Sequence, residues 1–94
     1  MEKNEIIILL VDDEPDIIEI VRYNLSLQGY RILTAKNGHE AVEKAKEFRP
    51  HLILLDVMMP KKDGFTLGKE IKEIKNDQPI IFLTAKNMRE DVLN

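Results

Sequence analysis

Two short apolar runs that end in acidic residues are the strongest constraint on how this chain folds. Residues 6–11 read Ile-Ile-Ile-Leu-Leu-Val and precede Asp12 and Asp13, while residues 52–55 read Leu-Ile-Leu-Leu and precede Asp56. Uninterrupted apolar runs of this length are typical of strands that are buried on both faces of a parallel sheet. Ligands of such sheets bind outside the carboxyl ends of the strands, so we expect these acids to meet in one small site.

The segments that follow the first run show the periods of a helix, a strand and a second helix. Apolar side chains spaced close to 3.6 residues apart predict a helix over residues 16–28, namely Ile17, Ile18, Val21, Leu25 and Leu27. Residues 31–35 are predicted to form a short strand. Pro50 ends a second helix, whose inner face is marked by Ala41, Val42, Ala45 and Phe48.

The second half of the chain repeats this alternation. Residues 58–64 have the composition of a loop, and the helix after it is predicted to turn Leu67, Ile71 and Ile74 inward. A last strand is predicted over residues 79–84. Alternating strands and helices with short connections form right-handed crossovers, so the expected fold class is α/β, a doubly wound parallel sheet with helices on both faces.

Composition narrows the classes of protein further. With 94 residues the chain has room for one domain, and its net charge of -3 argues against non-specific nucleic-acid binding. The absence of cysteine excludes a disulfide framework, a zinc knuckle and a thiol nucleophile. The apolar runs are too short to span a membrane, and residues 1–5 lead straight into the first strand without a leader pattern, so we expect a cytoplasmic protein.

Three carboxylates at one sheet edge repel one another, which raises a pKa or recruits a cation. Mg²⁺ suits such a site because it takes oxygen ligands, keeps several waters and combines one or two carboxylates with a phosphate oxygen. A carboxylate oxygen beside the cation can attack a phosphoryl donor. Asp56 is the best placed candidate for that role.

Four motifs together resemble the response-regulator receiver domain of two-component signalling. They are Val-Asp-Asp-Glu-Pro at 11–15, Leu-Asp-Val-Met-Met-Pro at 55–60, Asp-Gly at 63–64 and Leu-Thr-Ala at 83–85, and the match covers essentially the whole chain. The resemblance implies a flavodoxin-like fold. It also implies a phosphoacceptor that receives its phosphoryl group from a histidine kinase with Mg²⁺, a switch rather than a turnover enzyme.

The resemblance also implies a role for each matching residue. Asp56 is similar to the phosphoacceptor aspartate, and Asp13 to the direct magnesium ligand. Asp12 corresponds to the outer acid that acts on metal-bound water, and the backbone carbonyl of Met58 to a further ligand. Thr84 corresponds to the switch hydroxyl, which turns toward the phosphoryl group and repacks the face that meets partners.

The chain departs from the family pattern at its end. The resemblance implies five strands and a lysine after the fifth, whereas few residues follow Thr84, and Lys86 does not match that lysine. We therefore expect residues 1–94 to form a receiver domain that is incomplete at its C-terminus, without the fifth strand and fifth helix. The strand at 80–84 then becomes a sheet edge that favours a homodimer or a domain-swapped assembly.

Several alternatives compete with these assignments. Residues 12–15 can simply cap a helix, and Asp56 can be a turn residue. A magnesium-dependent phosphohydrolase with an aspartate nucleophile usually has a second aspartate two residues later, where this chain has Met58. A third possibility is a receiver fragment that folds or assembles without signalling. His39 and His51 lack metal-ligand spacing and are interpreted as structural.

Overall fold

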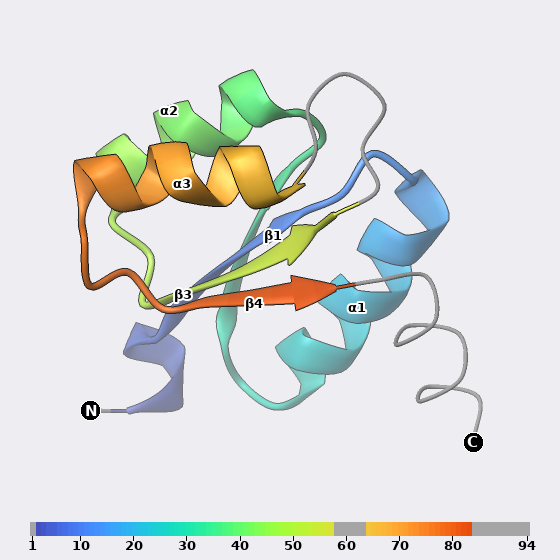
Figure 1. Cartoon of the computed structure of the whole chain (residues 1–94). Coiled ribbons are helices and arrows are strands. Elements are labelled where there is room, and N and C mark those ends of the chain that lie inside the picture. Colours follow the sequence, from blue (N-terminus) through green and yellow to red (C-terminus); the bar gives the residue numbers. More distant parts are fainter. Residues whose placement is uncertain (1, 58–63, 84–94) are drawn as a thin grey trace.

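The computed structural model describes residues 2–57 and 64–83, and all structural statements below concern these residues (Figure 1). Strands and helices alternate along the chain as predicted. The elements are η1 (Lys3–Glu5), β1 (Ile7–Val11), α1 (Pro15–Leu27), β2 (Arg31–Ala35), α2 (Gly38–Phe48), β3 (Leu52–Asp56), α3 (Gly64–Ile74) and β4 (Ile80–Leu83).

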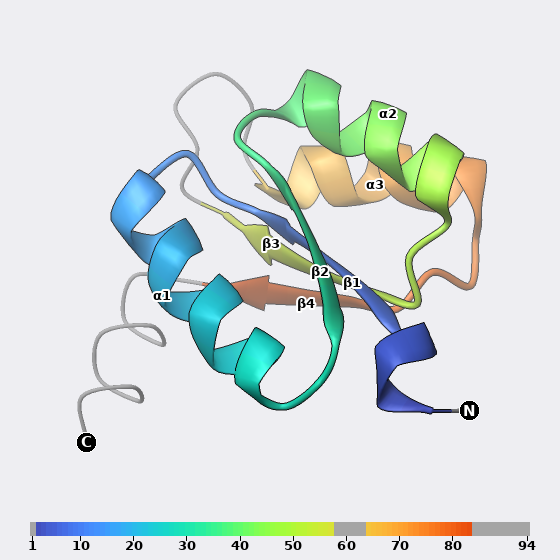
Figure 2. The same cartoon turned by 180° about the vertical axis from the view of Figure 1, so that it is seen from behind.

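The strands form one parallel sheet in the order β2-β1-β3-β4. Figures 1 and 2 show α1 on one face of this sheet, and α2 and α3 side by side on the opposite face. The predicted doubly wound α/β class is therefore confirmed. The chain reverses its direction of winding between β1 and β3, so the carboxyl ends of these neighbouring strands flank a topological switch point.

The main hydrophobic core lies between the sheet and the helices α2 and α3. Alternate residues of β1 and β3 point into it, and the small side chains of α2 let this helix approach the strands closely. Its buried members are Leu9, Val11, Ala35, Ala41, Ala45, Ile53, Leu55, Leu67 and Ile71. The helical spacing in the sequence correctly predicted the inward-facing residues of α2 and α3, except for the last residue of each helix.

Phe48 and Ile74 were predicted to face inward, but their exposed fractions are 38% and 42%. Each is the last residue of its helix, α2 and α3 respectively, so only the earlier turns have the sheet beneath them. Helical periodicity identifies the apolar side of a helix but not how far the neighbouring sheet extends.

The opposite face of the sheet is less completely covered within the described ranges. α1 contributes no buried residue, and Leu27, which the periodicity assigned to the packed side, is 66% exposed. Ile81 on β4 is 50% exposed. The two faces of the sheet therefore differ in how much apolar surface they leave accessible.

Several element boundaries differ from the sequence prediction, most of them by one residue. Residues 3–5 form the short helix η1 instead of leading directly into a strand, and the first strand begins at Ile7. Asp56 is the last residue of β3 because it continues the pairing with Leu83 of β4. Among the described residues, none of the helices combines the length and the apolar character needed to cross a bilayer.

Candidate metal centre

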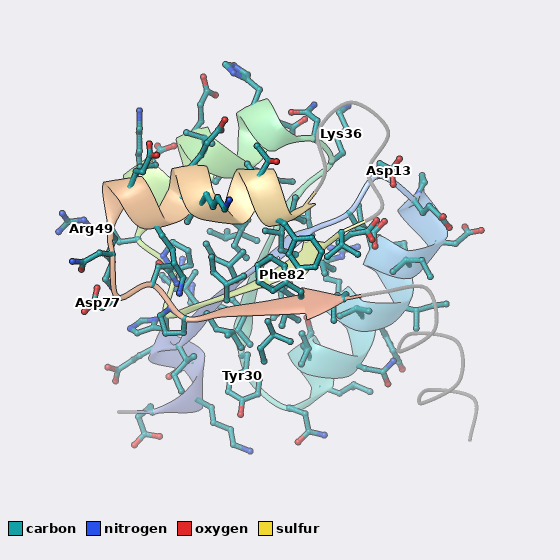
Figure 3. All side chains as sticks on the ribbon, viewed as in Figure 1. Asp13, Tyr30, Lys36, Arg49, Asp77 and Phe82 are labelled. Carbon is teal, nitrogen blue, oxygen red and sulfur yellow. The ribbon has the colours of Figure 1, made fainter. Side chains whose placement is uncertain are left out.

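The three predicted acids meet at the carboxyl edge of the sheet. Asp12 and Asp13 follow β1 directly, and Asp56 ends β3, which pairs with β1 in parallel. One carboxylate oxygen from each of these residues lies within 4.8 Å of the others. Figure 3 labels Asp13 at this edge, at the opposite end of the molecule from Arg49. The expectation that the acids converge is confirmed by this geometry.

Asp12 is the buried member of the group. Its backbone N–H donates to the carbonyl of Ala35 over 3.1 Å, and its carboxylate accepts a hydrogen bond from the N–H of Glu14 over 2.9 Å. Burial raises the pKa of Asp12 from 3.8 to about 6, against the lowering effect of the Glu14 N–H. The value of about 6 also includes the raising effects of the negative charges of Asp56, Asp13 and Glu14, each of which is smaller than the effect of burial.

The donor set fits a small hard cation. Carboxylate oxygens are the ligands that Mg²⁺ prefers. A bound cation would offset both the burial of negative charge and the repulsion between the acids, which together raise the pKa of Asp12. Asp13 and Asp56 are only half-buried, so the cluster is accessible from solvent. A cation held here would keep open positions for water and for a phosphate oxygen.

Helix capping accounts for only part of the acidic sequence at residues 12–15. The N-cap of α1 is Glu14, whose side chain makes no capping hydrogen bond, and Pro15 begins the helix. The carboxylate of Asp12 accepts from the N–H of Glu14, which is a local turn interaction. Capping therefore does not explain why Asp13 lies beside Asp56.

Gly64, the first residue of α3, lets this helix approach the acidic site closely. The sequence analysis placed Gly64 in a loop and in the Asp-Gly motif at 63–64, and neither assignment predicted this close approach. Its N–H donates to the carbonyl of Val57 over 3.3 Å. A Cβ atom at this position would lie 2.4 Å from the backbone oxygen of Asp56 and 2.6 Å from the Cα of Val57. A glycine at the start of a helix was the available sequence signal, but the sequence does not show which backbone approaches it.

Two predicted site residues, Met58 and Thr84, lie outside the described residues, so their assigned roles stay predictions. The segments that lead to them are described. The N–H of Val57 donates to the carbonyl of Leu83 over 3.1 Å, and Leu83 pairs with Asp56 in the β3–β4 register. β4 therefore ends beside the residue proposed to react.

Both histidines lie outside the acidic cluster of the described residues, which is consistent with their interpretation as structural residues. His39 lies 3.0 Å from Glu43 on the exposed surface of α2. The Nδ1 atom of His51 accepts a hydrogen bond from the N–H of Ile7 over 3.0 Å, and the N–H of His51 donates to the carbonyl of Ile7. His51 thus joins the beginnings of β1 and β3.

Comparison with known proteins identifies the family. The family model for the response regulator receiver domain matches residues 8–94. The Bacillus subtilis alkaline phosphatase synthesis transcriptional regulatory protein PhoP is 46% identical over 84 residues, which are 89% of this chain and 35% of PhoP. The probable transcriptional regulator ycf27 of Pyropia yezoensis is 45% identical over 90% of this chain and 35% of its own length. The chain thus spans about a third of these curated relatives.

Solved structures agree with this match. The response regulator TrrA of Thermotoga maritima, in complex with Mg²⁺-BeF, has a TM-score of 0.81 at 42% identity, covering 93% of this chain and 76% of TrrA. A complex of the histidine kinase ThkA with TrrA contains a chain that matches with a TM-score of 0.80 and 44% identity, over 85% of this chain and 69% of that one.

The fold and the site define a parallel α/β domain with three clustered carboxylates at its topological switch point. The chain belongs to the response regulator receiver domain family. It is therefore a receiver domain of the kind used in two-component signalling, a class of signalling modules.

Proposed function

We propose that this receiver domain, over residues 1–94, accepts a phosphoryl group on Asp56 from a histidine kinase. The observation that carries the proposal is the convergence of three carboxylate oxygens within 4.8 Å at the switch point of the sheet. The Mg²⁺-BeF complex of TrrA and the complex of TrrA with its kinase support it by similarity. A cytoplasmic location is part of this proposal, because kinases draw their phosphoryl groups from ATP.

Each residue has a distinct task in this proposal. An oxygen of Asp56 forms a bond to phosphorus while the bond from phosphorus to the donor imidazole nitrogen breaks, and the imidazole keeps the electron pair. Asp13 and Asp56 hold Mg²⁺ together with the carbonyl of Met58, and Asp12 orients water around it. Bound Mg²⁺ supplies neutralising charge to the acids and to the phosphoryl oxygens. Thr84 serves as the switch hydroxyl.

Intact mass after incubation with acetyl phosphate and Mg²⁺ tests the proposal. We expect a gain of one phosphoryl group that disappears in Asp56→Asn and in the presence of a chelator. Asp77→Asn is the matched control, because Asp77 is exposed and lies outside the acidic cluster. No gain in protein shown by circular dichroism to be folded, or an unchanged gain in Asp56→Asn, would overturn the assignment.

The proposed function does not include repeated hydrolysis of the phosphoryl donor. An aspartate-based phosphohydrolase needs a general acid to release its product, and the usual position of that acid holds Met58. We therefore expect one phosphorylation event per chain rather than repeated hydrolysis of the donor. Steady release of phosphate at many equivalents per chain would favour the enzyme instead.

A second candidate function is assembly through the β4 edge, as a homodimer or a domain-swapped form. Ile81 is half exposed on β4, which has a neighbouring strand on one side only within the described residues. Ile20, Tyr23 and Leu27 add exposed apolar surface on α1. Unpaired strand edges and contiguous apolar surface favour pairing with another chain.

A further inference from the structure

A cavity of about 480 Å³ lies between the C-terminal halves of α2 and α3, far from the acidic cluster. Helices of a parallel α/β fold run back against the strands, so this cavity lies at the amino edge of the sheet. Figure 3 shows Arg49 at this end of the molecule and Asp13 at the other. The volume is within the range of small-molecule sites.

The lining of the cavity combines an apolar floor with a cationic rim. Ala45, Ile71 and Ile74 supply the apolar surface, and all the charged side chains that line it are basic, namely Lys46, Arg49 and Lys75. Within the described part of the chain, none of these three cations forms an ion pair. This charge is concentrated on a chain whose net charge is -3. The surface is complementary to a compact anion that has an apolar body.

The backbone at Arg49 gives an independent reason to assign a task to its side chain. Arg49 is the C-cap of α2 and has φ 49° and ψ 63°, the left-handed conformation in which glycine is the usual residue. Its backbone N–H, which any residue except proline can supply, bonds to the carbonyl of Ala45. The cap therefore needs this conformation but not an arginine side chain, and a strained non-glycine residue is a marker of functional sites.

We propose that this cavity binds a small organic anion, with its apolar body against Ile71 and Ile74 and its carboxylate, sulfonate or phosphate head among Lys46, Arg49 and Lys75. The competing explanation is that Lys46 and Arg49 only complement the partial negative charge at the C-terminus of α2. If that explanation holds, replacing Lys46 or Arg49 changes the stability of the folded chain but does not change its affinity for an anion. The proposal does not depend on phosphorylation of Asp56.

Titration of the full chain with octanoate, followed by amide chemical shifts, tests the site. We expect saturable shifts confined to the ends of α2 and α3 and to the segment before β4, around residues 45–49 and 71–78. Octylammonium, which has the same body and the opposite charge, should bind at least about tenfold more weakly. Equal affinity for the two probes, or octanoate shifts elsewhere only, would overturn the proposal.

Arg49→Gly separates binding from folding. This variant removes the charge and relieves the left-handed strain, so its melting temperature should stay equal or rise. Its affinity for octanoate should fall about tenfold, and further in combination with Lys75→Gln. Lys72→Gln is the matched control, because Lys72 lies in the last turn of α3 but does not line the cavity. Unchanged affinity in Arg49→Gly would show that the cation serves the helix terminus alone.

Discussion

Asp12 shows how one residue can belong both to the fold and to the site. Its backbone continues the pairing of β1 with β2, while its side chain is buried next to two further carboxylates. An ionised group in this position is disfavoured by lost hydration and by like charges. The ionised carboxylate of Asp12 therefore lowers the stability of the folded chain. A bound cation or protonation of Asp12 would restore that stability.

Replacement of Asp12 by asparagine should stabilise the metal-free chain above about pH 6. The folded-state pKa of about 6 exceeds the ordinary value of 3.8. Between these two pH values, the Asp12 carboxyl group therefore keeps its proton in the folded chain and has released it in the unfolded chain. The contribution of Asp12 to stability is therefore complete below the ordinary value and is lost as the pH rises through about 6. Asparagine keeps an oxygen for the Glu14 N–H and carries no charge.

Thermal unfolding with a chelator, followed by circular dichroism across this pH range, measures the effect. The melting temperature of Asp12→Asn should exceed that of the parent by a few degrees above about pH 6, and the gap should close near the ordinary value of 3.8. A variant that melts below the parent above about pH 6 would contradict the argument.

Magnesium should raise the melting temperature of the chain through the same acids. A ligand at one hundred times its dissociation constant stabilises the folded state by about 2.7 kcal/mol. Asp13→Ala should abolish this rise, because it removes a half-exposed carboxylate of the cluster. Asp16→Ala is the control, since Asp16 lies in the first turn of α1 outside the cluster. An equal magnesium response in all three proteins would exclude the site.

At the scale of elements, the position of α3 depends on close contacts at glycines. Gly64 lets the start of α3 lie against the backbone of Asp56, and Gly68 lets its next turn approach the ring of Phe82 on β4. That ring also contacts Phe65 at a centroid distance of 4.8 Å. The helix is therefore seated on the two strands whose ends lie at the acidic site.

Gly64→Ala should destabilise the fold by about 3 kcal/mol, because its Cβ would lie 2.4 Å from a backbone oxygen that cannot move independently of β3. Gly68→Ala is the matched control. Its Cβ would meet the side chain of Phe82 at 3.0 Å, and alanine's better helix propensity offsets part of that crowding. Urea unfolding measures both variants, and a Gly64→Ala loss no larger than that of Gly68→Ala would refute the argument.

The start of α2 depends on a side-chain cap. The Oδ1 atom of Asn37 accepts a hydrogen bond from the N–H of Glu40 over 2.8 Å. Asn37→Ala should cost about 1 kcal/mol of unfolding free energy. Asn24→Ala serves as comparison, because Asn24 lies within α1 and donates to the carbonyl of Ile20, so alanine there should cost little. Equal losses at both positions would argue against the cap.

At the scale of the whole molecule, the two faces of the sheet are stabilised unequally. The face under α2 and α3 holds the connected core, whereas the α1 face leaves Ile81, Tyr23 and Leu27 exposed. Such a surface buries apolar area when two chains meet. If two copies of the chain associate, we therefore expect the contact to involve the α1 face and the β4 edge.

Ile81→Lys should weaken self-association of the chain, because a lysine on an edge strand opposes strand pairing. We expect the sedimentation coefficient of the parent to rise with concentration and that of the variant to stay constant. Phe48→Lys is the matched control, since Phe48 is an exposed apolar residue on the other side of the sheet and should leave association unchanged. A parent chain that stays monomeric at high concentration would contradict the prediction.

The sequence was sufficient for the order of elements and for the identity of the acids. Apolar runs and helical spacing are local signals, and they located the four strands of the described residues with errors of at most one residue at each end. Placing Asp12, Asp13 and Asp56 on one edge needed only the rule that parallel strands share a direction. The short helix η1 was missed because residues 3–5 carry no apolar period.

Only the tertiary structure shows the properties that depend on the distance between segments remote in sequence, such as pKa shifts, close backbone contacts and burial. Three properties show this dependence: the raised pKa of Asp12, the contact of Gly64 with Asp56 and the exposure of Phe48. Each of them is set by how close the neighbouring segments lie in the folded chain. Likewise, Arg49 and Lys75 line one cavity only because α2 and α3 end side by side. Periodicity fixes the direction in which a side chain faces, but burial and charge interactions depend on separations that arise only when the elements pack.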